Sequence, residues 1–333
     1  MLLRSMFIKA AAPIRRLRSQ TPLIERYLEL RLDEREARSI QTASDRAGVP
    51  FGAYYYWQLQ KTLVNNHIRR LKKQSILRMV AALDTTDYSP LDRLRDDPRG
   101  LLVALPHHGH FILSIVAVVE RLRDAREVFI FFGSPKTHAG NEIFDDLHAH
   151  LFGHLPGVHV IHDNRSGLAR ALRALPQGAA VIIMPDVYRN ENDTFLVPFC
   201  GRQLNVPLGT ASIARKTHSV ILPLVSLPTE RAPGFRNVFG DPIAPSEEHR
   251  DSAAGNLDDD DTVHLDYGVT LRMFRHFEQV MDRSILHWQY VRGHYLREAP
   301  FPALTAEALK NLVDPFFADP RTNVNLGNPL RLD

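Results

Sequence analysis

Residues 101–114 read LLVALPHHGHFILS, and the fold is decided by this stretch. An apolar run at 101–105 stops at Pro106, three histidines follow within the next four residues, and a second apolar run begins at Phe111. This pattern predicts a buried strand, a tight turn and an inward-facing helix. Because open α/β sheets place their chemistry beyond the carboxyl ends of their strands, the three imidazoles are candidate functional groups.

The same alternation continues along the chain. Further apolar runs typical of buried strands lie at 128–132, 158–162, 179–184 and 220–227. Helical patterns separate them at 111–123, 141–152, 166–175 and 207–217. Alternating strands and helices predict the α/β class, with a mostly parallel sheet flanked by helices.

Three regions are expected along the chain. Residues 1–95 form a helical N-terminal segment that packs on the main domain, 96–300 form the α/β domain, and 301–333 form an extended C-terminal tail. Inside the α/β domain, residues 245–262 are acidic and poor in apolar side chains, which is typical of a surface loop. A C-terminal helix is expected at 263–285.

The N-terminal segment is predicted to contain two main helical stretches. Gly48-Val49-Pro50 interrupts the helical pattern. The second stretch, 51–83, starts with aromatic residues and is expected to continue as one basic amphipathic helix. Its basic residues fit a face for phosphates or a carrier protein, and they also fit an ordinary solvated helix face.

Composition excludes several classes of protein. With 333 residues, 44% hydrophobic and 24% charged, the chain can bury a large core and needs no disulfides or structural metal for stability. A single cysteine, Cys200, excludes a disulfide framework and fits a reducing cytoplasm. The net charge of +3, with no alternation of basic and aromatic residues, argues against a nucleic-acid partner. Residues 1–20 combine basic and apolar side chains, which fits either peripheral contact with the inner membrane or a frayed basic terminus.

Three stretches carry residues suited to chemistry. A neutral imidazole of the histidine turn can accept a proton from an attacking hydroxyl or amine, although such histidines can also serve only local backbone groups. Asp186 follows the run at 179–184, where it would orient a histidine, position a substrate or make an Asx turn. Residues 195–217 contain a tight turn around Pro198-Phe199 and Gly201, followed by a helix whose N-terminus favours an anion.

The order of these motifs resembles a known family. A histidine turn after a strand, Asn164-Arg165 before a helix, a strand ending in Pro-Asp, and the segments VPFCGR and VPLGTASIARKT occur in sequence. This order is similar to that of the late acyltransferases of lipid A biosynthesis, which belong to the lysophospholipid/glycerolipid acyltransferase superfamily. The resemblance covers about residues 100–230 and extends to the tryptophan-containing stretch at 284–290.

The resemblance implies transfer of an acyl group from a thioester to a hydroxyl or amine. The donor would be acyl-coenzyme A or an acyl carrier protein, and neither a cofactor nor a metal is implied. The family motif H-x4-D/E places its base on His107, but Ile112 stands at the position of the acid. Asp186 and His110 are therefore candidate catalytic partners of His107. The candidate substrate-binding residues are His108, Gly109, Phe111, Arg165, Phe199, Gly201 and Arg202.

Two other functions remain open from the sequence. Without the usual acid, the chain would also fit a catalytically degenerate protein that binds an acyl chain or a carrier protein. His108-Gly109-His110 resembles the first half of a metal-hydrolase motif, although Phe111, Ile112 and Leu113 stand where its second half would be. A dinucleotide-binding enzyme is disfavoured because the first strand is not followed by a G-x-G-x-x-G turn.

Overall fold

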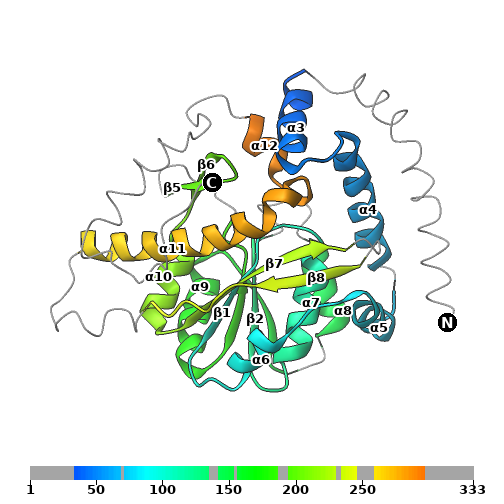
Figure 1. Cartoon of the computed structure of the whole chain (residues 1–333). Coiled ribbons are helices and arrows are strands. Elements are labelled where there is room, and N and C mark those ends of the chain that lie inside the picture. Colours follow the sequence, from blue (N-terminus) through cyan, green and yellow to red (C-terminus); the bar gives the residue numbers. More distant parts are fainter. Residues whose placement is uncertain are drawn as a thin grey trace.

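A six-stranded sheet forms the centre of the protein (Figure 1). The computed structural model describes residues 34–68, 71–134, 142–153, 156–186, 194–229, 234–245 and 259–296. The strands, in their order across the sheet, are β3 (Val158–His162), β2 (Val128–Phe132), β4 (Ala180–Ile183), β1 (Leu101–Ala104), β7 (Val220–Pro228) and β8 (Phe235–Phe239). The first five strands are parallel, and β8 runs antiparallel to β7.

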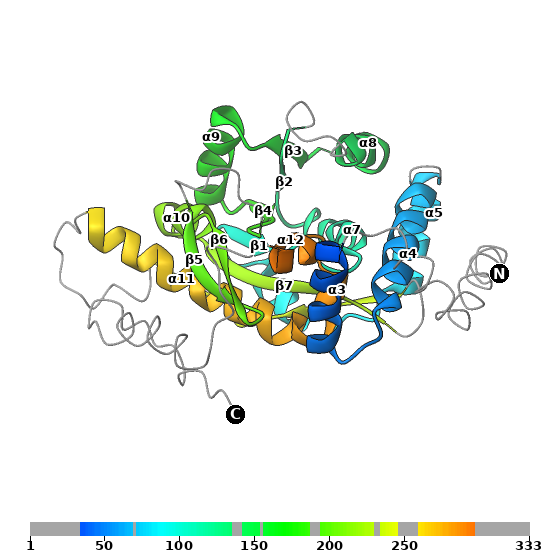
Figure 2. The ribbon, with the colours of Figure 1, turned by 90° about the horizontal axis from the view of Figure 1, so that it is seen from above.

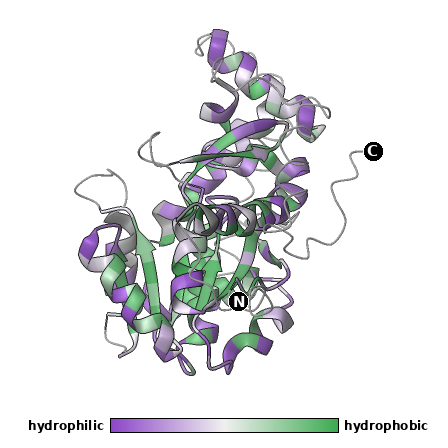
Figure 3. Ribbon diagram, turned by 90° about the vertical axis from the view of Figure 1, so that its left-hand side faces the viewer, coloured by the Kyte–Doolittle hydropathy of each residue, from purple (hydrophilic) through white to green (hydrophobic). Residues whose placement is uncertain are grey.

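Helices cover both faces of the sheet (Figure 2). The cover of one face includes α5 (Lys73–Leu83), α6 (Ser89–Arg95), α7 (Phe111–Leu122) and α8 (Glu142–Leu151), and that of the other includes α9 (Arg165–Ala174), α10 (Gly209–Thr217) and α11 (Asp259–Met281). Successive residues of β1 point to opposite faces, so Leu101 and Val103 join one core while Leu102 and Ala104 join the other. Hydrophobic residues accordingly concentrate in the strands (Figure 3). The predicted fold class is confirmed.

The two ends of the described chain meet beside the sheet. Helices α3 (Glu34–Ala47) and α4 (Gly52–Ile68) contact the 3₁₀ helix η3 (Asp282–His287), and α3 also packs against α12 (Val291–Leu296). Ser39 donates a hydrogen bond to the backbone oxygen of Arg292 at 2.8 Å. Strands β5 (Phe195–Phe199) and β6 (Arg202–Val206) form a separate two-stranded hairpin nearby. No helix in the described ranges combines the length and the apolar character that a membrane crossing needs.

Several expected boundaries are wrong. The predicted helix at 51–83 is divided, because α4 ends at Ile68 and α5 begins at Lys73. The C-terminal helix begins at Asp259, inside the predicted acidic loop at 245–262. Residues 246–258 of that loop lie outside the described residues, as do residues 1–33 and the tail at 301–333. Strands β5, β6 and β8 and helix α6 were not predicted. The predicted helix at 207–217 begins only at Gly209.

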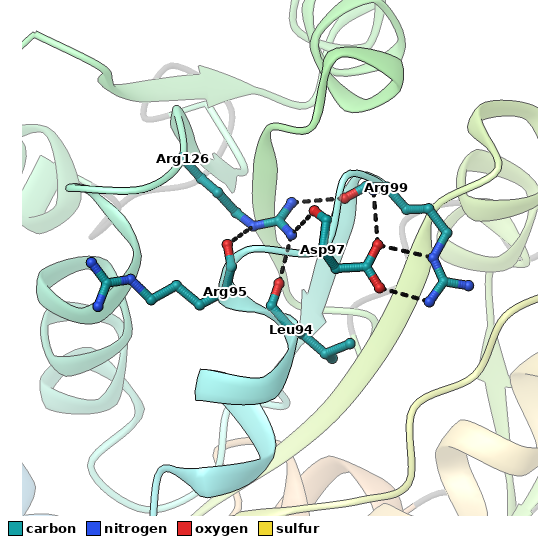
Figure 4. A network of polar contacts seen from close by, with 5 residues as sticks. All are labelled: Leu94, Arg95, Asp97, Arg99 and Arg126. Atoms are coloured by element: carbon teal, nitrogen blue, oxygen red, sulfur yellow. Dashed lines mark hydrogen bonds and ion pairs between the residues drawn. The ribbon is translucent and has the colours of Figure 1, made fainter.

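The amino end of the sheet is tied together by a buried arginine (Figure 4). Arg126 precedes β2 and is 7% exposed. Its guanidinium donates to five backbone oxygens, those of Leu94, Arg95, Asp97, Arg99 and Gly178. The end of α6 and the segments that enter β1 and β4 are thereby joined at the edge of the sheet opposite to the histidine turn.

Replacing Arg126 with methionine is expected to lower the free energy of unfolding by about 3–5 kcal/mol, because the aliphatic length is kept while five partly or fully buried carbonyls lose their donor. Urea denaturation measures the change. Arg99→Met is the matched control, since the Arg99 side chain is 35% exposed and pairs with Asp97, two positions away in the chain. Equal losses in the two variants would show that the five-carbonyl contact has no special weight.

Candidate active site

The register of two neighbouring strands brings His107 and Asp186 together. Ala104 of β1 lies opposite Ile183 of β4 in the parallel pairing. Each functional residue stands three positions beyond its member of this pair. Because parallel strands end at the same edge of the sheet, equal offsets place the two side chains next to each other.

The pair makes two direct hydrogen bonds. The Nδ1 atom of His107 lies 2.8 Å from Oδ1 of Asp186, and the backbone N–H of His107 donates to Oδ2 at 2.8 Å. A carboxylate only accepts hydrogen bonds, so Nδ1 carries a proton, and when the ring is neutral Nε2 presents a lone pair. The His107 side chain is 11% exposed, whereas that of Asp186 is 1% exposed. The arrangement is that of a histidine base oriented by a buried acid.

A third donor completes the surroundings of the carboxylate. The indole N–H of Trp288 donates to Oδ2 of Asp186 at 2.8 Å. Burial by itself raises the pKa of the Asp186 carboxyl, but the electrostatic attraction of His107 and the three N–H donors from His107 and Trp288 outweigh it, so the net pKa lies below the ordinary value. Asp186 is therefore an anion at neutral pH.

His108 and Gly109 shape the turn. His108 is fully buried, and its ring nitrogens lie 2.8 Å from the backbone oxygen of Ser226 and 2.9 Å from that of Ser284. Burial lowers the pKa of His108, and the contacts with the two backbone oxygens partly oppose this shift. Gly109 has φ +59°, and a Cβ there would collide with the Ser226 carbonyl. Both residues face the protein interior.

His110 occupies a separate buried cluster. Its ring packs on Trp57 at 4.9 Å and lies 3.4 Å from the side-chain nitrogen of Gln60. Trp57 also contacts the ring of His287 at 4.6 Å. Burial lowers the pKa values of His110 and His287 to about 3. The ring of His110 thus contacts residues of α4. The carboxylate that contacts the ring of His107 is that of Asp186.

Phe111 and Arg165 lie at different distances from the pair. Phe111 begins α7, and its ring contacts that of His107 at 5.0 Å. Arg165 is exposed at the start of α9, which follows β3. Because β2 separates β3 from β4, Arg165 lies at the same edge of the sheet but about 10 Å of sheet width from Asp186. Phe111 therefore borders the pair, while Arg165 lies further along the same edge.

Of the three candidate residues of the hairpin, Phe199 is linked to the pair through Trp288. Phe199 is buried and contacts the Trp288 ring at 5.2 Å. Gly201 has φ +73° in the turn between β5 and β6. Arg202 donates to the backbone oxygen of His294 at 3.1 Å and lies over the ring of Tyr295. The binding roles of these residues stay predictions.

Within the described ranges, no group of three or more His, Cys, Asp and Glu side chains is arranged to hold a metal ion. The ring nitrogens of His108 are engaged by protein groups, and His110 faces α4. Among the described residues, none thus joins His108 and His110 to form a set of metal ligands.

A family model for bacterial lipid A biosynthesis acyltransferases matches residues 66–290, which is more than half of the chain. The chain belongs to this family. No curated protein sequence matches it. The match includes the histidine turn, Asp186 and Trp288, so the family assignment and the assembled site concern the same part of the molecule.

One member of the site could not be named from the sequence. Trp288 was recognised only as part of a segment that resembles this acyltransferase family, and its contact with Asp186 joins residues 102 positions apart. The available signal is its place in the mixed stretch Ser284–Tyr290, at the end of the last long predicted helix. A single tryptophan in such a stretch reads equally well as a core residue.

Proposed function

We propose that the protein transfers an acyl group from a coenzyme A or carrier-protein thioester to a hydroxyl or amine acceptor. The observation that carries this proposal is the 2.8 Å contact between His107 and the buried Asp186. The chain belongs to the lipid A acyltransferase family, but it has Ile112 at the position where the family motif has an acid. Asp186 supplies, from the end of another strand, the carboxylate that the family motif places within the histidine turn.

In the proposed reaction, Nε2 of His107 accepts the proton of the acceptor as its oxygen or nitrogen attacks the thioester carbonyl carbon. Asp186 holds Nδ1–H and stabilises the imidazolium that forms. The C–S bond then breaks, and the proton passes to the departing thiolate. The products are an ester or amide and a free thiol. We assign stabilisation of the oxyanion to backbone N–H groups of the first turn of α7, which starts without a side-chain cap.

The remaining substrate assignments follow from position. Phe111 borders His107 and is proposed to contact the acyl chain. Arg165, exposed at the same edge of the sheet, is proposed to bind a phosphate or other anion of a substrate, since its guanidinium can donate two parallel hydrogen bonds. Peripheral membrane contact through residues 1–20 and a cytoplasmic location are proposed with the same function. These residues lie outside the described part of the chain.

The test is mass spectrometry of the purified protein incubated with mixed acyl-coenzyme A and acyl-carrier thioesters and a panel of hydroxyl and amine acceptors. We expect an acylated acceptor and an equal amount of free thiol. His107→Ala is the matched control and should yield only the residual product that substrate binding and oxyanion stabilisation support without the base. Binding of a thioester without turnover would instead support the degenerate acyl-binding function, for which Ile112 is the favouring observation.

A further inference from the structure

The stretch Ser284–Tyr290 holds the backbone of the histidine turn. The N–H of Gly109 donates to the oxygen of His287 at 3.1 Å, and the N–H of Gln289 donates to the oxygen of His107 at 2.9 Å. These two bonds make an antiparallel bridge between His108 and Trp288. A segment almost 180 positions later in the chain thus fixes the turn that carries the proposed base.

Trp288 also sets the orientation of the Asp186 carboxylate. Its indole N–H and the backbone N–H of His107 both donate to Oδ2, each at 2.8 Å. Two donors on one oxygen restrict rotation of the carboxylate about its terminal torsion, which is otherwise broad. The other oxygen, Oδ1, is consequently directed at Nδ1 of His107.

The indole itself is held by rings on several sides. Trp288 is fully buried, and it contacts Phe199 at 5.2 Å, His294 at 5.3 Å and Tyr290 at 6.0 Å. Nε2 of His294 lies 3.1 Å from the backbone oxygen of Phe199. This contact joins α12 to the end of β5. Because these neighbours are packed, the indole N–H has one available direction, toward Asp186.

We propose that Trp288 is a positioning residue, whose indole N–H fixes Asp186 so that Oδ1 keeps His107 in the Nδ1–H tautomer. The role in turnover rests on the proposed acyl transfer, whereas the effect on the tautomer does not. An acid at position 112, where the family motif has one, would be held in place by the first turn of α7. Asp186 comes from a different strand, and Trp288 supplies the second support that its orientation needs.

The test compares Trp288→Phe with Trp57→Phe. Each variant keeps an aromatic ring and removes an indole N–H, but among the described residues the N–H of Trp57 is buried without a hydrogen-bond partner. In protein labelled with ¹⁵N-histidine, the His107 shifts at neutral to mildly alkaline pH should report one tautomer in the wild type and in Trp57→Phe, and a mixture in Trp288→Phe. The His107 signals are assigned by their loss in His107→Ala.

Turnover provides the second measurement. Trp288→Phe should lower kcat about 10-fold to 100-fold, as is typical when a group that orients a functional residue is removed, with KM for the thioester unchanged. Trp57→Phe should retain wild-type kcat. A wild-type tautomer and kcat in Trp288→Phe would overturn the proposal. If no acyl transfer is found for the wild type, the proposed function fails while the tautomer still decides the role of Trp288.

A further measurement covers the case in which Trp288→Phe does not fold. The indole ¹H–¹⁵N signals of the two tryptophans are followed in Asp186→Asn. We expect the Trp288 signal to shift and the Trp57 signal to stay, because only Trp288 donates to residue 186. An unshifted Trp288 signal would contradict the contact on which the proposal depends.

Discussion

Replacing Asp186 with asparagine should lower the rate of acyl transfer about ten-thousand-fold, the loss produced by the corresponding change in a Ser-His-Asp triad. Oδ2 of Asp186 receives two N–H donors, so the asparagine oxygen will turn toward them and its NH₂ group toward His107. Nδ1 of His107 must then accept a hydrogen bond, which moves its proton to Nε2. The nitrogen that should take the proton of the acceptor is then already protonated.

A double variant and a control at another buried acid test this reasoning. The rate of His107→Ala combined with Asp186→Asn should be no lower than that of His107→Ala alone, because the acid acts only through the base. Asp266→Asn is the control, since Asp266 is also buried and paired, with Arg215 at 2.8 Å, in helices distant in sequence from the histidine turn. Initial rates at saturating thioester provide the comparison. Multiplicative losses in the double variant would contradict a joint role.

The parallel sheet was predictable because its strands are buried on both faces. Apolar runs such as 128–132 need no alternation, and the predicted and observed bounds of β2 and β3 agree. Strand β8 was missed because its buried positions include a polar residue: Asn237 is 5% exposed and donates to Tyr88 Oη. That hydrogen bond depends on a contact between residues 149 positions apart, which local patterning does not reveal.

The hairpin was missed for a different reason. A turn is predicted around Pro198-Phe199 and Gly201. Gly201 does lie in the turn, together with Cys200, but Pro198 and Phe199 lie within β5. Cys200 and Gly201 have positive φ, 48° and 73°, as in the two-residue turns that join antiparallel strands. The pair Asn-Gly is the strong sequence signal for such a turn, and Cys-Gly is not.

The sequence predicted where His107 and Asp186 lie in the sheet, but not the contacts that surround the histidine turn. The positions of His107 and Asp186 after separate strands indicated that they share one edge of the sheet, and the structure places them in contact. The sequence alone did not separate the three histidines of the turn by environment. His108 and His110 are buried by the Ser284–Tyr290 segment and by α4, and both of these come from outside the turn.

Acidification from pH 7.5 to pH 5.5 should lower the free energy of unfolding by about 4 kcal/mol through three buried histidines. Burial lowers the pKa values of His110 and His287 to about 3 and that of His294 to about 4. In the unfolded chain each histidine titrates near 6.5. Between those values the unfolded state binds more protons than the folded state, so stability decreases as the pH falls below 6.5, by about 1.4 kcal/mol per pH unit for each histidine.

The physical cause is the burial of these rings, which removes water from the charged imidazolium and so disfavours it. His110 faces Gln60 and Trp57, and the charge of Lys61 lowers its pKa further. The rings of His110 and His287 both contact Trp57, so a proton on one disfavours a proton on the other. A loss of about 4 kcal/mol is a large part of the 5–15 kcal/mol that stabilises an ordinary domain.

Urea denaturation at a series of pH values measures the slope. His110→Asn should reduce the loss between pH 7.5 and 5.5 by about a third, because asparagine stays neutral and can still meet Gln60. His264→Asn is the control, since residue 264 is exposed and its replacement removes an imidazole from outside the core. If the His110 and His264 variants both have the wild-type slope, the acid sensitivity does not come from His110, and the burial of its neutral ring against α4 is wrong.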